Sequence, residues 1–222
     1  MSHKQNRTTA VHALRLGACA GLALSLLLVT GCGAGPRPAP APPCDQACQD
    51  GVALLGLRTA MKVAYNFTVS AHPVGAQDAM VPCISFDGKV GGSVHIFGDD
   101  VEVDAKQGAS IIPILHPLSY DFKNCLYSAP PDPTADQNYS LTLDGLVTET
   151  GTLSAQPTST TSLIIQTALD PTTMQPTDTL SISGTVYDPP VDYAVSNCAL
   201  SVIQNGNAVS GALCGRNAGF MF

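Results

Sequence analysis

Three carboxylates alternate with two valines in the segment Asp100-Val101-Glu102-Val103-Asp104. In an extended strand, alternate side chains point to opposite faces, so the three acids would share one face. Three such carboxylates could bind Ca²⁺, a hard cation that takes six to eight oxygen ligands. Because no glycine-rich loop of the EF-hand type accompanies them, the preferred interpretation is a solvated face whose charges deter edge-to-edge pairing. A calcium site at Asp100, Glu102 and Asp104 is the alternative, and no other cofactor is predicted.

The histidines beyond the N-terminal segment are His72, His95 and His116. A catalytic triad needs a nucleophile, a base and an orienting acid within hydrogen-bond reach of one another. Ser93 and His95 would share one face of a strand without facing each other, and no Gly-x-Ser-x-Gly elbow occurs. The sequence also lacks His-Glu-x-x-His, a phosphate-binding loop and a dinucleotide fingerprint. We therefore predict no catalytic residues and keep a hydrolase as an alternative.

The first 31 residues have the organisation of an export signal. Basic residues precede an uncharged run, Leu16–Thr30, whose centre is rich in leucine. At ~1.5 Å per helical residue, this run spans about 22 Å, which is short of the ~30 Å hydrocarbon core of a bilayer. A signal segment that is removed on export is therefore a better interpretation than a permanent membrane helix.

The run ends in Val29-Thr30-Gly31-Cys32. With the leader before them, these residues resemble the type II signal peptide and lipobox of bacterial lipoproteins. The resemblance implies cleavage between Gly31 and Cys32, and lipidation of Cys32 with a diacylglyceryl group and usually an N-acyl chain such as palmitate. Two or more acyl chains anchor a protein stably. In this family an aspartate after the cysteine tends to mean inner-membrane retention, so Gly33 implies the outer membrane, with the domain on its periplasmic or cell-surface face.

Cysteine usage agrees with export. Cys19 would leave with the leader and Cys32 would carry the lipid, so an even number remains, which is typical of disulfides in an exported chain. The remaining six are Cys44, Cys48, Cys83, Cys125, Cys198 and Cys214. Six cysteines allow 15 pairings, which the sequence leaves open. Cys198 with Cys214 is the first choice because they flank a turn at 205–207, Cys83 with Cys125 is the second, and Cys44 with Cys48 is left by elimination. Free thiols or a metal site are the alternative.

Composition divides the chain into three parts: a signal peptide at 1–31, the lipidated cysteine and a proline-rich tether at 32–43, and a single β-rich domain at 44–222. All 17 acidic residues lie beyond residue 31, against seven basic ones, so the mature charge is −10. Such a surface is a poor partner for nucleic acid. We therefore predict no nucleic-acid partner and a membrane contact through the lipid anchor, and the sequence identifies no protein or ligand partner.

Periodicity predicts one helix followed by strands. Leu54, Leu57, Met61 and Ala64 repeat at three- and four-residue intervals, which indicates a helix from Asp45, its expected N-cap, to Ala64. Alternating and β-rich segments separated by Gly, Pro, Asp and Asn indicate strands at 64–71, 82–90, 92–97, 100–106, 119–127, 138–148, 150–155, 161–169, 178–187, 193–204 and 208–214. Because the connections are short, we expect antiparallel pairing. The predicted fold is mainly β, an antiparallel meander (curved sheet or sandwich) with the N-terminal helix packed on it.

The leading hypothesis for function is a lipid-anchored envelope protein with a structural or binding role and no evident catalytic chemistry. One alternative is a secreted-type hydrolase on the same β scaffold, which needs a cleft that brings a histidine to a serine or carboxylate. The other is a carrier of an apolar ligand, which needs a sheet-enclosed cavity of several hundred Å³ lined by aliphatic side chains.

Overall fold

One helix and ten strands make up the part of the chain that the computed structural model describes, residues 44–71, 75–101, 111–129, 138–154, 161–168, 177–186 and 189–222. The leader, Cys32 and the tether lie outside these residues. The helix is α1 (Gln46–Ala71). The strands are β1 (Gly75–Ile84), β2 (Val90–Val101), β3 (Ile111–Ser128), β4 (Tyr139–Ser154), β5 (Ser162–Gln166), β6 (Leu180–Val186), β7 (Val191–Cys198), β8 (Leu200–Asn205), β9 (Ala208–Leu213) and β10 (Arg216–Met221).

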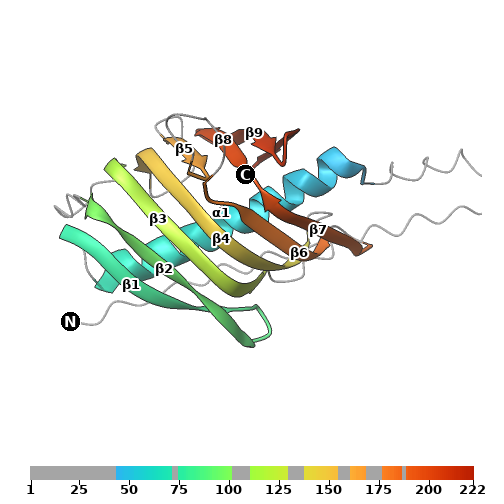
Figure 1. Cartoon of the computed structure of the whole chain (residues 1–222), viewed down its shortest axis with the longest axis horizontal. Coiled ribbons are helices and arrows are strands. Elements are labelled where there is room, and N and C mark those ends of the chain that lie inside the picture. Colours follow the sequence, from blue (N-terminus) through green and yellow to red (C-terminus); the bar gives the residue numbers. More distant parts are fainter. Residues whose placement is uncertain are drawn as a thin grey trace, which may run out of the picture. The chain divides into compact units, whose positions relative to one another are not determined.

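All ten strands belong to one antiparallel sheet (Figure 1). The main path runs β1-β2-β3-β4-β5-β8-β9-β10, so most strands lie beside their neighbours in the sequence. β4 forks, because residues 139–145 pair with β6 and residues 148–152 pair with β5. β7 adds to β6 on the first branch. The predicted fold class is confirmed, in the form of a single sheet with one N-terminal helix packed on it.

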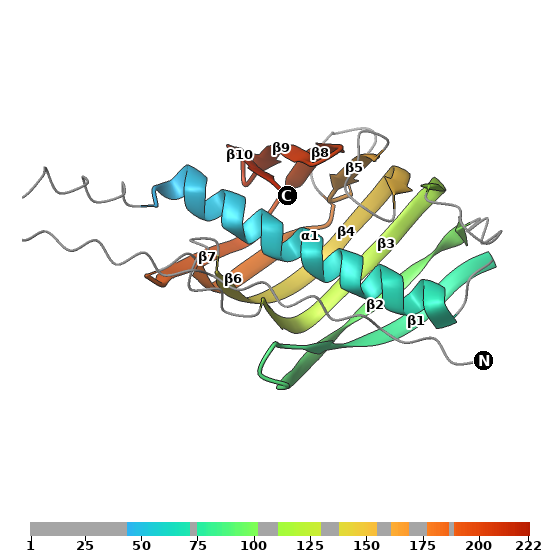
Figure 2. The same ribbon diagram turned by 180° about the vertical axis from the view of Figure 1, so that it is seen from behind.

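α1 lies across one face of the sheet, here called the inner face, and contacts strands as far apart as β1 and β10 (Figure 2). Asp45 caps it as predicted, since its carboxylate accepts a hydrogen bond of 2.9 Å from the Cys48 N–H. The predicted apolar residues Leu54, Leu57 and Met61 are buried. In the part of the chain that the structure describes, no helix has the length and apolar composition needed to cross a membrane. Helix and sheet thus form two layers around one core.

The strand predicted at 64–71 is wrong, because α1 continues through these residues. Tyr65 and Thr68 are buried and lie four and seven residues after Met61, so they extend its helical repeat. Phe67 faces solvent over about half of its surface. The alternation of apolar and polar residues at 64–71 therefore fits both the two-residue period of a strand and the 3.6-residue period of a helix. Packing against the inner face of the sheet selects the helix.

Two glycines that weaken an isolated helix let α1 approach the sheet closely. A β-carbon at Gly51 would lie 2.6 Å from the carbonyl oxygen of Gly219 in β10. One at Gly56 would lie 2.6 Å from a methyl group of Leu141 in β4. Both distances are shorter than van der Waals contact, so glycine is required at Gly51, where the neighbour is backbone, whereas a β-carbon at Gly56 would force the Leu141 side chain to shift.

Several strand boundaries differ from the prediction. The strands expected at 138–148 and 150–155 are the single long β4, and the one expected at 193–204 is divided between β7 and β8 at Ala199. β10 was missed because its residues are mostly small or polar. Its pairing along β9, rather than its own composition, makes it a strand.

The six cysteines of the domain form three disulfides, Cys44–Cys48, Cys83–Cys125 and Cys198–Cys214. These are the pairs ranked from the sequence, and their Cα–Cα distances of 5.3, 5.3 and 4.8 Å are usual for the bond. Cys198 ends β7, and Cys214 follows β9. This bond therefore ties together the two branches that leave β4.

Candidate functional site

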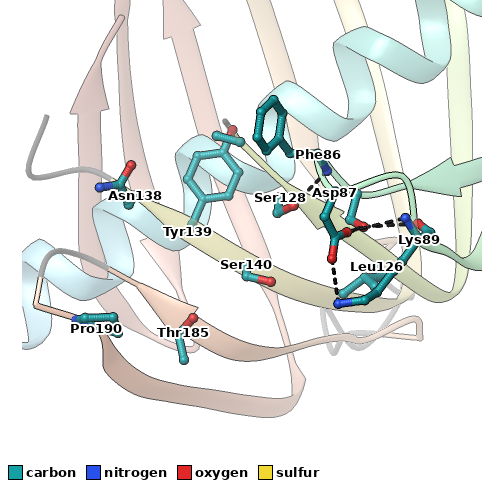
Figure 3. Close-up of a pocket in the computed structure, with 12 residues that line it drawn as sticks. Phe86, Asp87, Lys89, Leu126, Ser128, Asn138, Tyr139, Ser140, Thr185 and Pro190 are labelled. Atoms are coloured by element: carbon teal, nitrogen blue, oxygen red, sulfur yellow. Dashed lines mark hydrogen bonds and ion pairs between the residues drawn. The ribbon is translucent and has the colours of Figure 1, made fainter. Parts of the chain in front are cut away.

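An open pocket of about 420 Å³ lies at one end of the sheet and is called here the end-of-sheet pocket (Figure 3). Phe86, Asp87 and Lys89 of the β1–β2 turn lie on one side of it, and Asn138, Thr185 and Pro190 lie on the other. Strand register also brings a row of hydroxyl side chains to the pocket: Ser128 of β3 pairs with Ser140 of β4, which pairs with Thr185 of β6.

Hydrogen bonds hold the turn beside this pocket. The Asp87 carboxylate accepts a hydrogen bond from the Ser85 hydroxyl and forms an ion pair of 2.5 Å with Lys89 Nζ. These contacts, first that with Lys89 and then that with Ser85, lower the pKa of Asp87 to about 2. The backbone N–H of Phe86 donates to the Ser128 hydroxyl at 2.9 Å. The turn is thus fixed to β3, and Asp87 remains ionised at neutral pH.

No family model, curated protein or solved structure matches this chain. Its function has therefore to be inferred from the arrangement of its own residues.

His95 is the one predicted histidine whose side chain lies in the described residues. Its Nε2 atom is 2.7 Å from Asp78 Oδ1, across the β1–β2 pair. The Asp78 side chain is 84% exposed, and neither residue lines the end-of-sheet pocket. Ser93 pairs with Pro82 and Lys123, and not with His95. His72 and the side chain of His116 lie outside the described residues.

The predicted calcium ligands also fall outside what the structure describes. Asp100 belongs to β2 by its backbone, but its side chain, together with Glu102 and Asp104, is not described. Within the described ranges, no three His, Cys, Asp or Glu side chains gather where they could hold a metal ion. The calcium site remains a prediction from the sequence.

A second, apolar groove of about 140 Å³ lies between the second half of α1 and the β1 edge of the sheet. Its lining includes Val63, Phe67 and Ile84. The carrier alternative needs an aliphatic cavity of several hundred Å³, and this groove is smaller. The larger end-of-sheet pocket is lined by hydroxyl, amide and charged groups as well as apolar ones.

An ion pair that the sequence did not predict is buried between α1 and the sheet. Arg58 Nη2 of α1 lies 3.3 Å from Glu149 Oε1 of β4, and both side chains are almost wholly buried. Arg58 Nε also donates a hydrogen bond of 2.8 Å to Gln204 of β8. A signal was present: Glu149 occupies the inward position that follows Leu141, Leu143 and Val147 along β4.

A second buried carboxylate fastens the first turns of α1 to the end of the chain. Asp50 accepts hydrogen bonds of 2.8 Å from both Arg216 Nε and Nη2 in β10 and one of 2.7 Å from the Tyr193 hydroxyl in β7. Burial by itself raises the pKa of Asp50, but the hydrogen bonds from Arg216, Tyr193 and Gln46 outweigh it and lower the pKa below its ordinary value. We call Asp50, Arg216 and Tyr193 the helix latch.

The helix latch predicts acid sensitivity. Since the folded state lowers the pKa of Asp50, its ionised form adds stability above the unfolded-state value near 3.8, and this contribution is lost as pH falls further. We expect Asp50→Asn to be less stable than the parent at pH 7 and the gap between the two free energies of unfolding to narrow as pH falls below 3.8 toward the lowered folded-state pKa of Asp50. Urea unfolding from pH 7 to pH 2 measures both curves. Parallel curves over that range would contradict the assignment.

Proposed function

We propose that this chain is a lipoprotein of the bacterial envelope, anchored by acyl chains on Cys32 at the outer membrane, whose folded domain has a binding or structural role. Residues 33–43 include five prolines. At ~3.1 Å per residue in the polyproline conformation, they would hold the domain roughly 30 Å from the lipid.

The observation that carries the proposal is the pairing of all six cysteines of the domain into disulfides. Disulfides persist in oxidising compartments and are rare in the cytosol, where thiols are kept reduced. A domain stabilised in this way belongs outside the cytosol, which is where the leader and lipobox would send it. The fold supports export independently of the leader, since the paired cysteines lie in a different part of the chain.

The end-of-sheet pocket supports a binding role. Its lining offers the hydroxyls of Ser128, Ser140 and Thr185, the Asn138 amide and the apolar side chain of Leu126. A ligand that combines hydroxyl or amide groups with an apolar face would match this lining. Asp87, the carboxylate of the pocket, is ionised and paired with Lys89, which favours a fixed electrostatic contact over proton transfer.

Mass analysis tests the anchor directly. We expect protein extracted from membranes to lack residues 1–31 and to carry an acyl adduct on Cys32. Cys32→Ser is expected to abolish the adduct, because no other residue of the lipobox offers a thiol.

Cys19→Ser provides the matched control, since it removes a leader cysteine outside the lipobox. It should leave both the cleavage and the adduct unchanged. An intact leader, an unmodified Cys32, or the same adduct on the Cys32→Ser protein would show that the proposal is wrong.

A further inference from the structure

Large apolar side chains gather around the β1–β2 turn and the second half of α1. Val63, Phe67, Ile84, Phe86 and Val90 are 49, 54, 51, 59 and 68% exposed, respectively. We call these five residues the apolar patch. Single exposed apolar residues are ordinary on protein surfaces, whereas a cluster of them marks a surface that contacts something else.

These residues fall into two groups that share Ile84. Val63, Phe67 and Ile84 line the same apolar groove. Ile84 pairs with Val90 across the β1–β2 hairpin, and Phe86 lies in the turn that joins the two strands. This turn projects beyond the ends of the neighbouring strands in both views (Figures 1 and 2). Ile84, Phe86 and Val90 therefore lie at a protruding turn of the domain, and Val63 and Phe67 adjoin Ile84 on the α1 side.

The charges of the β1–β2 turn cancel. Asp87 and Lys89 pair with each other at 2.5 Å in the same turn that carries Phe86. The chain as a whole has a net charge of −7, so its general surface is repelled by anionic surfaces. A neutral, apolar turn on an acidic protein is suited to an uncharged apolar environment, and not to a charged partner.

We propose that the apolar patch inserts into the surface of the lipid bilayer that holds the anchor, which sets the orientation of the domain on the membrane. This inference rests on the proposed function for the presence of the bilayer. Phenylalanine and aliphatic side chains on an otherwise polar surface can lie at the interface between lipid headgroups and acyl chains.

The lengths of the chain segments agree with this occupant. Eleven residues separate Cys32 from Cys44, and they reach up to ~34 Å when extended at ~3.1 Å each. From Gln46 to Val63, α1 rises about 26 Å at ~1.5 Å per residue. A tether of this length allows both the lipid and the apolar patch to reach one bilayer.

The test uses a chain that begins at Pro42 and has no acyl group. All three disulfides and the whole described core lie beyond this residue, and 42–222 forms one compact unit. We expect this chain to float with phosphatidylcholine vesicles, and the double variant Ile84→Ser/Phe86→Ser to lower its vesicle partition coefficient tenfold or more, by roughly 1.4 kcal/mol or more. Because the contact is apolar, raising the salt from about 0.1 M to about 1 M should not release the chain.

Ile164→Ser is the matched control, since Ile164 in β5 is 47% exposed and lies outside the apolar patch. It should float like the parent. The inference would be overturned if the parent chain did not bind the vesicles, or if Ile164→Ser lowered binding as much as the double variant. It would also be overturned if the parent sedimented as a dimer that Ile84→Ser/Phe86→Ser dissociates, because a second copy would then cover the patch. Circular dichroism confirms that the variants fold, and Val90→Ser gives a second test of the same patch. The tested chain lacks Cys32, so its failure to bind vesicles would not affect the evidence for acylation. Likewise, an unmodified Cys32 would not affect the vesicle-binding result.

Discussion

Replacing Glu149 by alanine is expected to lower the free energy of unfolding by about 3–5 kcal/mol, because the variant leaves the Arg58 guanidinium buried without its counter-charge. Arg58 and Glu149 have side-chain exposures of 4% and 0% and face each other across the junction of α1 and β4. Urea unfolding at neutral pH measures the change.

The surroundings of this ion pair explain why its loss should be severe. Arg58 Nη1 and the Tyr65 hydroxyl find no hydrogen-bond partner within the described residues. Burial, followed by the negative charge of Glu149, raises the pKa of Tyr120 well above its ordinary value. Gln204 Oε1 accepts the hydrogen bond from Arg58 Nε, and Gln204 Nε2 donates to the Gly206 carbonyl, so Gln204 is already engaged and cannot replace the lost carboxylate.

A double variant separates the cost of an orphaned charge from the contribution of the pair itself. Arg58→Met with Glu149→Leu removes both charges and keeps the volume, and we expect it to be close to the parent in stability or more stable. Asp192→Ala, which removes an exposed acid from β7, should change stability by no more than about 0.5 kcal/mol. If Glu149→Ala costs less than about 1 kcal/mol, Arg58 is solvated in solution and the buried pair is not a feature of the folded protein.

Removal of the Cys83–Cys125 disulfide by a double alanine substitution is expected to cost about 4 kcal/mol, since the bond closes a loop of 42 residues in the unfolded chain. The bond joins β1 to β3, which are separated by β2 in the sheet. Second neighbours in a flat sheet lie roughly 9.5 Å apart, whereas these two Cα atoms are 5.3 Å apart. The β1–β2 hairpin must therefore curl over β3, and the disulfide holds it there.

The Cys44–Cys48 bond serves as the internal control. It spans only four residues, so the same loop-closure relation gives about 2 kcal/mol for its removal. Thermal or urea unfolding of the two double-alanine variants should rank them in this order. Hydrogen exchange should also show faster exchange of β1 amides in the Cys83→Ala/Cys125→Ala variant, because β1 is an edge strand held by β2 and this bond. An equal cost for the two bonds would mean that loop length does not decide their contribution.

Short-range patterns in the sequence were sufficient to predict the fold class, the buried face of the helix and its N-cap. The repeat of Leu54, Leu57 and Met61 predicted the buried face of α1, and Asp45 predicted its first turn. Cys198 and Cys214 flank a predicted turn, and for this reason their pairing was the first choice. Each of these features depends on residues close together in the sequence, whose relation is set by the period of a helix or the reach of a turn.

Tertiary structure alone decided the continuation of α1 to Ala71, the fork of β4, the buried ion pair, the helix latch and the apolar patch. Arg58 binds Gln204 at a separation of 146 residues, and Asp50 binds Arg216 at a separation of 166 residues. No local period relates such distant residues. Their meeting depends on which strands β4 takes as partners and on how closely Gly51 and Gly56 let the helix approach the sheet, because buried charges are stable only where the completed packing brings their partners to them.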